Sequence, residues 1–149
     1  TNTMHRMADE IEEATQMPLL HIADAAAGAI KTQGLDVVGL LGTNFTMTGD
    51  FYCKRLEEKH NIQVLIPDES DRQTVHRIIY DELVLGEIRD ESREAYLEVI
   101  DHLEKKGAQG VVLGCTEIPL LVKQEDVAIP IFDTTTLHAK AAVDWALAA

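Results

Sequence analysis

The sequence predicts an α/β fold in which one parallel sheet carries helices on both faces. Short apolar runs alternate with longer amphipathic segments along the 149 residues, a pattern typical of parallel strands joined by crossover helices. No stretch is rich enough in proline or low in complexity to be a linker. The expected strands are residues 19–22, 37–41, 62–66, 110–113 and 129–132.

Two segments between the expected strands have the 3.6-residue period of helices that bury one face. The apolar faces are formed by Val75, Ile78, Ile79 and Leu83 in one helix and by Ala95, Val99, Ile100 and Leu103 in the other. Gly34 and Gly107 are predicted to lie just past helix C-termini, where a left-handed backbone favours glycine.

Composition excludes several classes of protein. The formal net charge is −13, with 26 acidic against 13 basic side chains, so the chain repels a phosphate backbone and nucleic-acid binding is not expected. No apolar run approaches the length of a membrane span. The two cysteines, Cys53 and Cys115, lack metal-ligand spacing, and a reduced, cytoplasmic setting with no metal fits best. There is no signal peptide, and because the chain opens on Thr1 without an initiating methionine, we expect part of a longer protein.

The clearest candidate site follows the strand expected at 110–113. Gly114, Cys115, Thr116 and Glu117 come where that strand ends, and ligands of open α/β sheets bind at the carboxyl ends of strands. Backbone N–H groups and a helix N-terminus there would lower the pKa of the Cys115 thiol. Glu117 suits an ammonium group or orients a neighbour. A buried structural cysteine is the alternative, and we assign that role to Cys53.

A second loop follows the strand expected at 37–41. Gly42 permits a sharp turn, and Thr43 and Asn44 with free N–H groups suit a carboxylate. A helix cap without a ligand explains the same residues. His21 and His138 flank strand ends and are candidates to tune a thiol, although structural roles fit them as well.

A repeat relates the two ends of the chain. Thr1 and Asn2, followed by an amphipathic segment and an apolar run with a proline, parallel Thr116 and Glu117 with the segments that follow them. If the repeat is real, the residue before Thr1 occupies the place of Cys115.

With Gly-Cys-Thr-Glu-Ile at 114–118 and Thr-Asn-Thr-Met-His at 1–5 in view, the chain resembles the aspartate/glutamate racemase family. It is most similar to the C-terminal portion of the aspartate racemase branch, which includes broad-specificity amino-acid racemases. The resemblance implies two flavodoxin-like lobes that face each other across a cleft. Residues 19–128 would form the C-terminal catalytic lobe, with 19–31 joining its sheet, and 1–18 and 129–149 would be remnants of the N-terminal lobe.

The resemblance implies cofactor-independent racemisation, without pyridoxal phosphate, in which one cysteine removes the Cα proton and another protonates the opposite face. Cys115 would be the second cysteine and the residue before Thr1 the first, so this chain alone should be inactive. The same resemblance makes Thr1, Asn2, Thr3 and Thr116 substrate-binding residues. To these the strand-end loops add Thr43 and Glu117.

Two residues depart from patterns in the family. Glu117 stands where glutamate racemases carry histidine, and Val84 stands where some aspartate racemases carry a lysine for the side-chain carboxylate. A broader or more neutral pocket is therefore expected. The alternatives are a single-cysteine decarboxylase or isomerase, and a non-catalytic amino-acid-binding domain. Loss of a lobe would expose apolar surface, so we expect self-association, as a homodimer.

Overall fold

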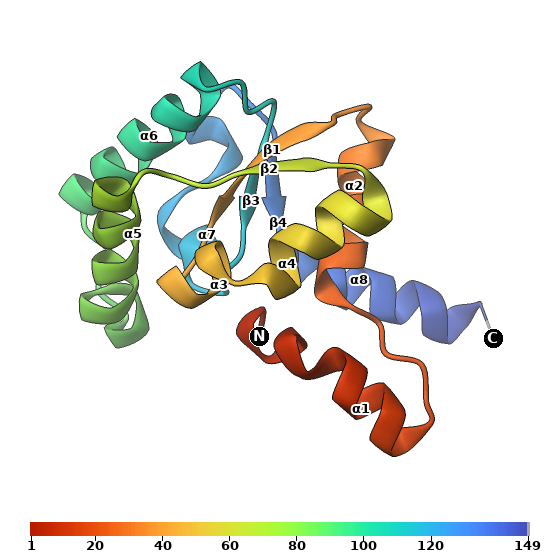
Figure 1. The fold of residues 1–149 in the computed structure, drawn as a ribbon. Helices are drawn as coiled ribbons and strands as arrows, with labels where there is room; N and C mark the ends of the chain where they lie inside the picture. The colour runs from red at the N-terminus through yellow and green to blue at the C-terminus, as the bar shows by residue number, and fades with distance from the viewer. Residues whose placement is uncertain (149) are drawn as a thin grey trace.

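The chain forms a four-stranded, all-parallel sheet with helices on both faces (Figure 1), which confirms the predicted fold class. The structure is a computed structural model that describes residues 1–148. The strand order is β2-β1-β3-β4. The strands are β1 (Val37–Leu41), β2 (Gln63–Leu65), β3 (Val111–Leu113) and β4 (Ile131–Asp133).

Eight α-helices lie within the described residues. None of them is both long and apolar enough to cross a membrane. The helices are α1 (Ala8–Thr15), α2 (Ile22–Thr32), α3 (Asn44–Thr48), α4 (Asp50–Lys54), α5 (Glu69–Asp81), α6 (Asp90–Lys105), α7 (Ile118–Leu121) and α8 (Thr134–Leu147). Further helical segments, which are not α-helical, are Thr3–Met7, Arg55–Lys59, Leu83–Leu85 and Gln124–Asp126. Gly34 (φ 71°) and Gly107 (φ 107°) follow α2 and α6 in left-handed conformations, as predicted.

Four of the five expected strands are present: β1 has the predicted bounds, β2 and β3 are slightly shorter, and β4 is shifted toward the C-terminus. The strand predicted at 19–22 is wrong. Leu19 and Leu20 form no regular structure, and Ile22 begins α2. The reason is local: His21 Nδ1 accepts a hydrogen bond from the Ala23 backbone N–H at 3.1 Å and so caps the helix. The segment 19–31 therefore joins the Cys115 sheet only through α2.

The two faces of the sheet bury separate apolar clusters. Side chains alternate along each strand, so Val38, Leu40 and Val112 pack in the cluster that contains α2. Leu41 and Leu113 point to the opposite face, into the cluster formed with α5 and α6. The faces of these two helices are those that the sequence predicts.

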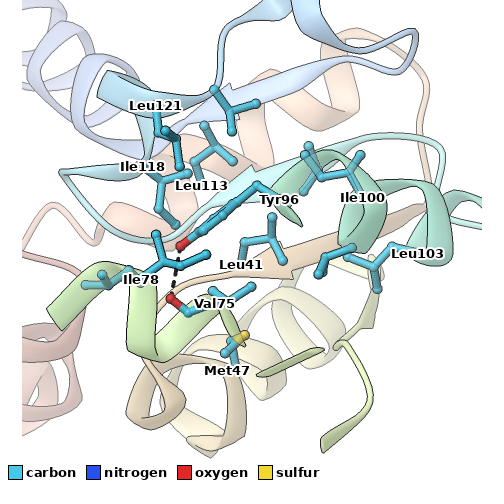
Figure 2. Packing of buried hydrophobic residues seen from close by; sticks show 14 of the residues in the cluster. Leu41, Met47, Val75, Ile78, Tyr96, Ile100, Leu103, Leu113, Ile118 and Leu121 are labelled. Carbon is cyan, nitrogen blue, oxygen red and sulfur yellow. Dashed lines mark hydrogen bonds between the residues drawn. The ribbon is translucent and has the colours of Figure 1, made fainter. Parts of the chain in front are cut away.

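The second cluster, shown in Figure 2, supports the residues that follow β3. Tyr96 of α6 is fully buried, and its hydroxyl donates a hydrogen bond to the Val75 carbonyl of α5 at 3.1 Å, so the phenol carries no unsatisfied polar atom into the core. Cys115 and Ile66 pack against the edge of this cluster. A rigid apolar core thus underlies the candidate thiol.

The C-terminal strand and helix belong to the same body as β3. Leu113 lies opposite Asp133 in the parallel pairing of β3 and β4, and α8 packs along α2. The predicted assignment of 1–18 and 129–149 to another lobe concerns a longer protein and stays a prediction. Residue 149, the end of that segment, lies outside the described residues.

Large apolar side chains remain exposed at both ends of the chain, in the N-terminal segment and on α8. Single exposed apolar residues are normal in folded proteins, but a gathering of them marks a contact surface. The most exposed are Met4, Met17, Val143, Trp145 and Leu147.

We expect the chain to self-associate through α8, because Trp145 is 47% and Leu147 80% exposed. The double substitution Trp145→Ser with Leu147→Ser should shift sedimentation velocity profiles toward the monomer. Ile88→Ser, at a similarly exposed residue before α6, is the matched control and should leave the profiles unchanged. A wild-type chain that sediments as a monomer at every concentration would contradict this expectation.

Candidate functional site

The candidate site is built where β1 and β3 end side by side. The two strands are parallel neighbours with Leu41 opposite Leu113, and each is followed by a glycine. The Gly114 N–H donates to the Leu41 carbonyl at 2.6 Å. A Cβ atom on Gly42 would lie 3.1 Å from the Gly114 carbonyl oxygen. The absence of side chains here lets the two turns meet, and this contact brings the loops of Thr43 and Cys115 together.

The N-terminal segment is tied to the end of β3 by two hydrogen bonds in series. The buried Thr134 hydroxyl donates to the Leu113 carbonyl at 2.8 Å. Since a hydroxyl has one proton, Thr134 Oγ1 must accept the second bond, which Asn2 Nδ2 donates at 3.0 Å. This fixes the orientation of the Asn2 amide and leaves its Oδ1 buried without a partner.

These elements border a cavity of about 200 Å³ that is partly open to solvent. All seven residues predicted for the site line it, although their roles in binding and catalysis stay predictions. The other four lining residues are Gly114, at the end of β3, and three residues from α5 and the turn that follows it, which the sequence does not predict to bind substrate. The lining consists of Thr1, Asn2, Thr3, Thr43, Ile79, Tyr80, Val84, Gly114, Cys115, Thr116 and Glu117.

The Thr43 loop acts as a helix cap, so one of its two predicted interpretations is confirmed. The Thr43 hydroxyl accepts a hydrogen bond from the Thr46 N–H at 3.4 Å. The N–H of Asn44 donates to His76 Nδ1 at 3.1 Å and is not free to bind an anion. The same Thr43 hydroxyl lies 3.3 Å from Thr46 Oγ1 and still lines the cavity.

Cys115 differs from expectation in its protonation. Burial, followed by the hydrogen bond to Glu117, raises the pKa of the Cys115 thiol to about 12. The Sγ atom donates that bond to Glu117 Oε2 at 2.9 Å. Backbone N–H groups of Thr116 and Glu117 lower the pKa, as predicted, but these effects are smaller. The net shift of the pKa is therefore upward, and burial together with Glu117 favours the neutral thiol over the thiolate.

Glu117 remains ionised beside this thiol. Burial alone would raise the pKa of its carboxyl group, but hydrogen bonds from the Cys115 and Thr116 side chains outweigh burial and hold it below its ordinary value. The short helix α7, only four residues long, begins after Glu117. The local geometry is thus a thiol that donates to a carboxylate, and the pair forms one edge of the cavity.

The other predicted candidates lie away from the cavity. His21 is buried, and its ring packs edge to face against that of His5 with centroids 4.8 Å apart. His138 Nε2 bonds to the Leu20 carbonyl at 2.8 Å. Neither histidine lines the cavity. Cys53 is half-buried, with Sγ 3.7 Å from the Met47 carbonyl, in keeping with a structural role. Among residues 1–148, no group of three or more His, Cys, Asp or Glu side chains is arranged to hold a metal.

Comparison with known proteins matches residues 1–142 to the family model described as Asp/Glu/Hydantoin racemase. A solved structure of a candidate Asp/Glu racemase from Yersinia pestis is 58% identical, with a TM-score of 0.95 over 99% of this chain. An aspartate racemase homologue from Pyrococcus horikoshii OT3 is 38% identical, with a TM-score of 0.88 over 98% of this chain. The broad specificity amino-acid racemase RacX of Bacillus subtilis is 26% identical over 99% of it.

The chain spans 64% of the length of each of these two solved structures and 63% of RacX. It aligns with a C-terminal portion of the full-length racemases.

The contact between the two turns predicts a large effect of a single methyl group. Gly114→Ala should destabilise the fold by about 1–3 kcal/mol, because its Cβ would lie 3.1 Å from both the Leu41 carbonyl oxygen and Leu40 Cδ1. Gly28→Ala is the control. Gly28 lies within α2, and outside its own helix backbone no atom lies within 4 Å of the added Cβ, so this substitution should stabilise the fold by about 0.5–1 kcal/mol. Urea unfolding measures both, and equal midpoints would refute the argument.

The thiol–carboxylate pair predicts that Glu117→Gln makes Cys115 more reactive. Loss of the charge lowers the thiol pKa, since Glu117 raises it both by its hydrogen bond and by its charge. Alkylation at pH 8 should accelerate about threefold for each pKa unit, because the gain in thiolate is partly offset by lower nucleophilicity. The rate is measured in a Cys53→Ala background. Glu125→Gln, on an exposed turn, should leave it unchanged, and a slower reaction of Glu117→Gln would contradict the pairing.

Proposed function

This chain belongs to the Asp/Glu/hydantoin racemase family, and we propose that the protein that contains it racemises a free amino acid by proton transfer at Cα without a cofactor. The observation that carries the proposal is the Cys115 thiol, hydrogen-bonded to Glu117 at 2.9 Å in a cavity at the carboxyl end of β3. A cavity of about 200 Å³ is smaller than the sites that take drug-sized ligands and suits an amino acid.

Cys115 is proposed to act as both acid and base. As acid, the thiol gives its proton to the Cα carbanion and becomes a thiolate. As base, it first passes its proton to the Glu117 carboxylate and then removes the Cα proton as a thiolate, which restores the thiol and leaves Glu117 protonated until it releases its proton. The raised pKa of Cys115 favours the acid role, because a group that keeps its proton at neutral pH is ready to donate it.

Inversion at Cα requires a second group on the opposite face of the substrate. Thr1 lines the same cavity as Cys115, and a residue bonded to Thr1 would have its Cα about 3.8 Å from that of Thr1. A cysteine at that position therefore lies within reach of the cavity. We propose it as the partner of Cys115, so that a chain without it does not racemise.

The remaining lining residues are proposed to hold the polar groups of the substrate. Hydroxyl donors from Thr1 and Thr3 suit the α-carboxylate, whereas the Thr116 hydroxyl donates its proton to Glu117 and can only accept from the substrate. Fixed donors also stabilise the negative charge that develops on the carboxylate as the Cα proton leaves. The unpaired Oδ1 of Asn2 and the Glu117 carboxylate are acceptors and suit the α-ammonium group. The two charged groups of the zwitterion thus have separate partners.

A single-cysteine decarboxylase or isomerase is the second candidate function. The protonated state of Cys115 supports this candidate as well as racemisation, since one thiol suffices to protonate an enolate or carbanion. The residue encoded before Thr1 distinguishes the two: cysteine supports racemisation, and an alanine or glycine supports the alternative.

In a cell, we propose that the protein works in the cytoplasm.

Racemisation should depend on Cys115 in the full product of the gene that encodes this chain. Cys115→Ser keeps the shape of the side chain but replaces the thiol with a hydroxyl of much higher pKa. Turnover should therefore fall by about 10²–10⁴-fold. Turnover is measured by chiral chromatography with a panel of amino acids of both hands. Cys53→Ser, which changes a cysteine outside the cavity, is the matched control. Wild-type-like racemisation by Cys115→Ser would overturn the mechanism.

A further inference from the structure

Three histidine rings meet where the N-terminal segment lies against α2 and α8, outside the cavity that Cys115 lines. The ring of His5 packs against that of His21 with centroids 4.8 Å apart and against that of His138 with centroids 5.2 Å apart. His5 comes from the N-terminal segment, whereas His21 caps α2 and His138 lies in α8. His5 is therefore the middle ring of this histidine cluster, and it connects the N-terminal segment to two helices.

Hydrogen bonds fix which ring nitrogens carry a proton, because a carbonyl oxygen can only accept a hydrogen bond. His5 Nδ1 lies 2.9 Å from the Thr1 carbonyl oxygen and therefore donates to it. His138 Nε2 donates to a backbone carbonyl in the same way. His21 Nδ1 accepts an N–H of α2, so this nitrogen is not protonated. All three bonds form with neutral imidazoles.

His5 holds the residues that line the N-terminal side of the cavity. Its ring binds the Thr1 carbonyl, and its own backbone N–H donates to the Asn2 carbonyl at 3.1 Å. These two bonds close a turn over Thr1 and Asn2, which line the cavity together with Thr3. Any residue bonded to Thr1 continues from the same turn, so its position depends on His5 as well.

Protonation of the docked His5 ring is unfavourable. Burial is the largest cause and, with the nearby His138, lowers the pKa of His5, while hydrogen bonds to the carbonyls of Thr1 and Leu20 raise it and only partly offset the shift. The amino group of Thr1 contributes only where no residue precedes it. A cation at His5 would lie beside two further imidazoles in a half-buried position, where loss of hydration and like charge both oppose it.

The other charged side chains around the cluster balance one another. Burial, followed by the charges of Arg55 and His5, lowers the pKa of His21 to about 4, and Asp24 opposes this shift. Two ion pairs lie beside the rings, and the side chains outside these pairs are two cations and two anions. The groups are Arg55 with Asp24 and His60, Lys54 with Asp50, and Arg6, Lys59, Asp9 and Glu58. Because carboxylates, lysine and arginine keep their charge in mildly acidic solution, the histidines carry the change of charge there.

We propose that His5 is a positioning residue that holds Thr1–Thr3 at the cavity while the three rings are neutral, and that mildly acidic solution weakens this hold. A detached His5 takes up a proton at its ordinary pKa of about 6.5, whereas the docked ring does so only at lower pH. The docked state therefore binds fewer protons, so its stability is complete above about pH 6.5 and is lost as the pH falls below that value. The inference concerns the placement of the segment and does not depend on the proposed reaction.

Amide hydrogen exchange in the full product of the gene tests this inference without a substrate. The protection of a peptide that covers Thr3–Met7 is measured by mass spectrometry at pH 7.5 and at pH 5.5, corrected for the intrinsic exchange rates. In the wild type, this protection should fall by about three- to tenfold relative to that of peptides from α6. The reason is that at one pH unit below its ordinary pKa the detached ring binds a proton that the docked ring does not.

His5→Asn separates the hydrogen bond from the titration. The asparagine amide can donate to the Thr1 carbonyl in place of Nδ1 but takes up no proton, so protection should differ by less than about twofold between the two pH values. His5→Ala removes the donor and should lower protection about three- to tenfold at pH 7.5. His102→Asn is the matched control, since His102 lies on α6 and binds Asp71 at 2.8 Å. It should show the same fall as the wild type.

The outcomes separate this inference from the proposed function. Protection that does not fall with pH in the wild type, or that falls equally in His5→Asn, would overturn the pH-sensitive hold. Equal protection of His5→Ala and the wild type at pH 7.5 would overturn the positioning role. Failure of the full product to racemise any amino acid would overturn the proposed function, and the exchange measurements would still decide the role of His5.

Discussion

The candidate site depends on the close approach of the carboxyl ends of β1 and β3. Two glycines, Gly42 and Gly114, make that approach possible, because a Cβ on either one would meet backbone oxygen at 3.1 Å. Once the turns are in contact, Thr43 and Cys115 border the same cavity. The Leu113 carbonyl, at the end of β3, accepts the Thr134 hydroxyl, and through Thr134 it also fixes Asn2. Four segments far apart in the sequence therefore meet around one strand end.

The protonation of Cys115 depends more on the burial of its thiol than on activation by neighbouring N–H groups. In an open loop, N–H groups and a helix end would favour the thiolate of Cys115. Here the thiol packs against the core that contains Tyr96, and the Glu117 carboxylate accepts a hydrogen bond from it. Both features favour the neutral thiol. Glu117 is in turn held ionised by the bonds it accepts, so the pair stores one proton at a defined position beside the cavity.

Much of the fold could be predicted because hydrophobic periodicity reports which face of an element is buried. The strands around residues 37–41 and 110–113 and the helix faces of Val75 and Val99 follow this rule. The strand predicted at 19–22 failed because a short apolar run fits a strand or the entry to a helix equally well. A side-chain cap by His21 decided in favour of the helix, and no sequence period reveals such a bond.

The sequence predicts most of the residues that line the site but not the electrostatics of the site. Gly114 and Cys115 stand out because a glycine and a thiol end a buried strand. Whether the pKa of Cys115 is raised or lowered depends on how deeply the turn is buried and on where the Glu117 carboxylate points. Both are tertiary properties. Tyr80 was missed for a related reason: α5 reads as a helix with one buried face, and only the packed structure turns its last residues toward the cavity.

The most direct test of the account is to follow deuterium at Cα during the first turnovers in D₂O, with the full product of the gene and an amino acid that it racemises. Chiral chromatography with mass spectrometry measures the label in substrate and product separately. Two opposed groups, one of them Cys115, predict that the product enantiomer carries deuterium while the remaining substrate still carries protium. Deuterium that enters both enantiomers equally from the start would mean that one group serves both faces, and would contradict the account.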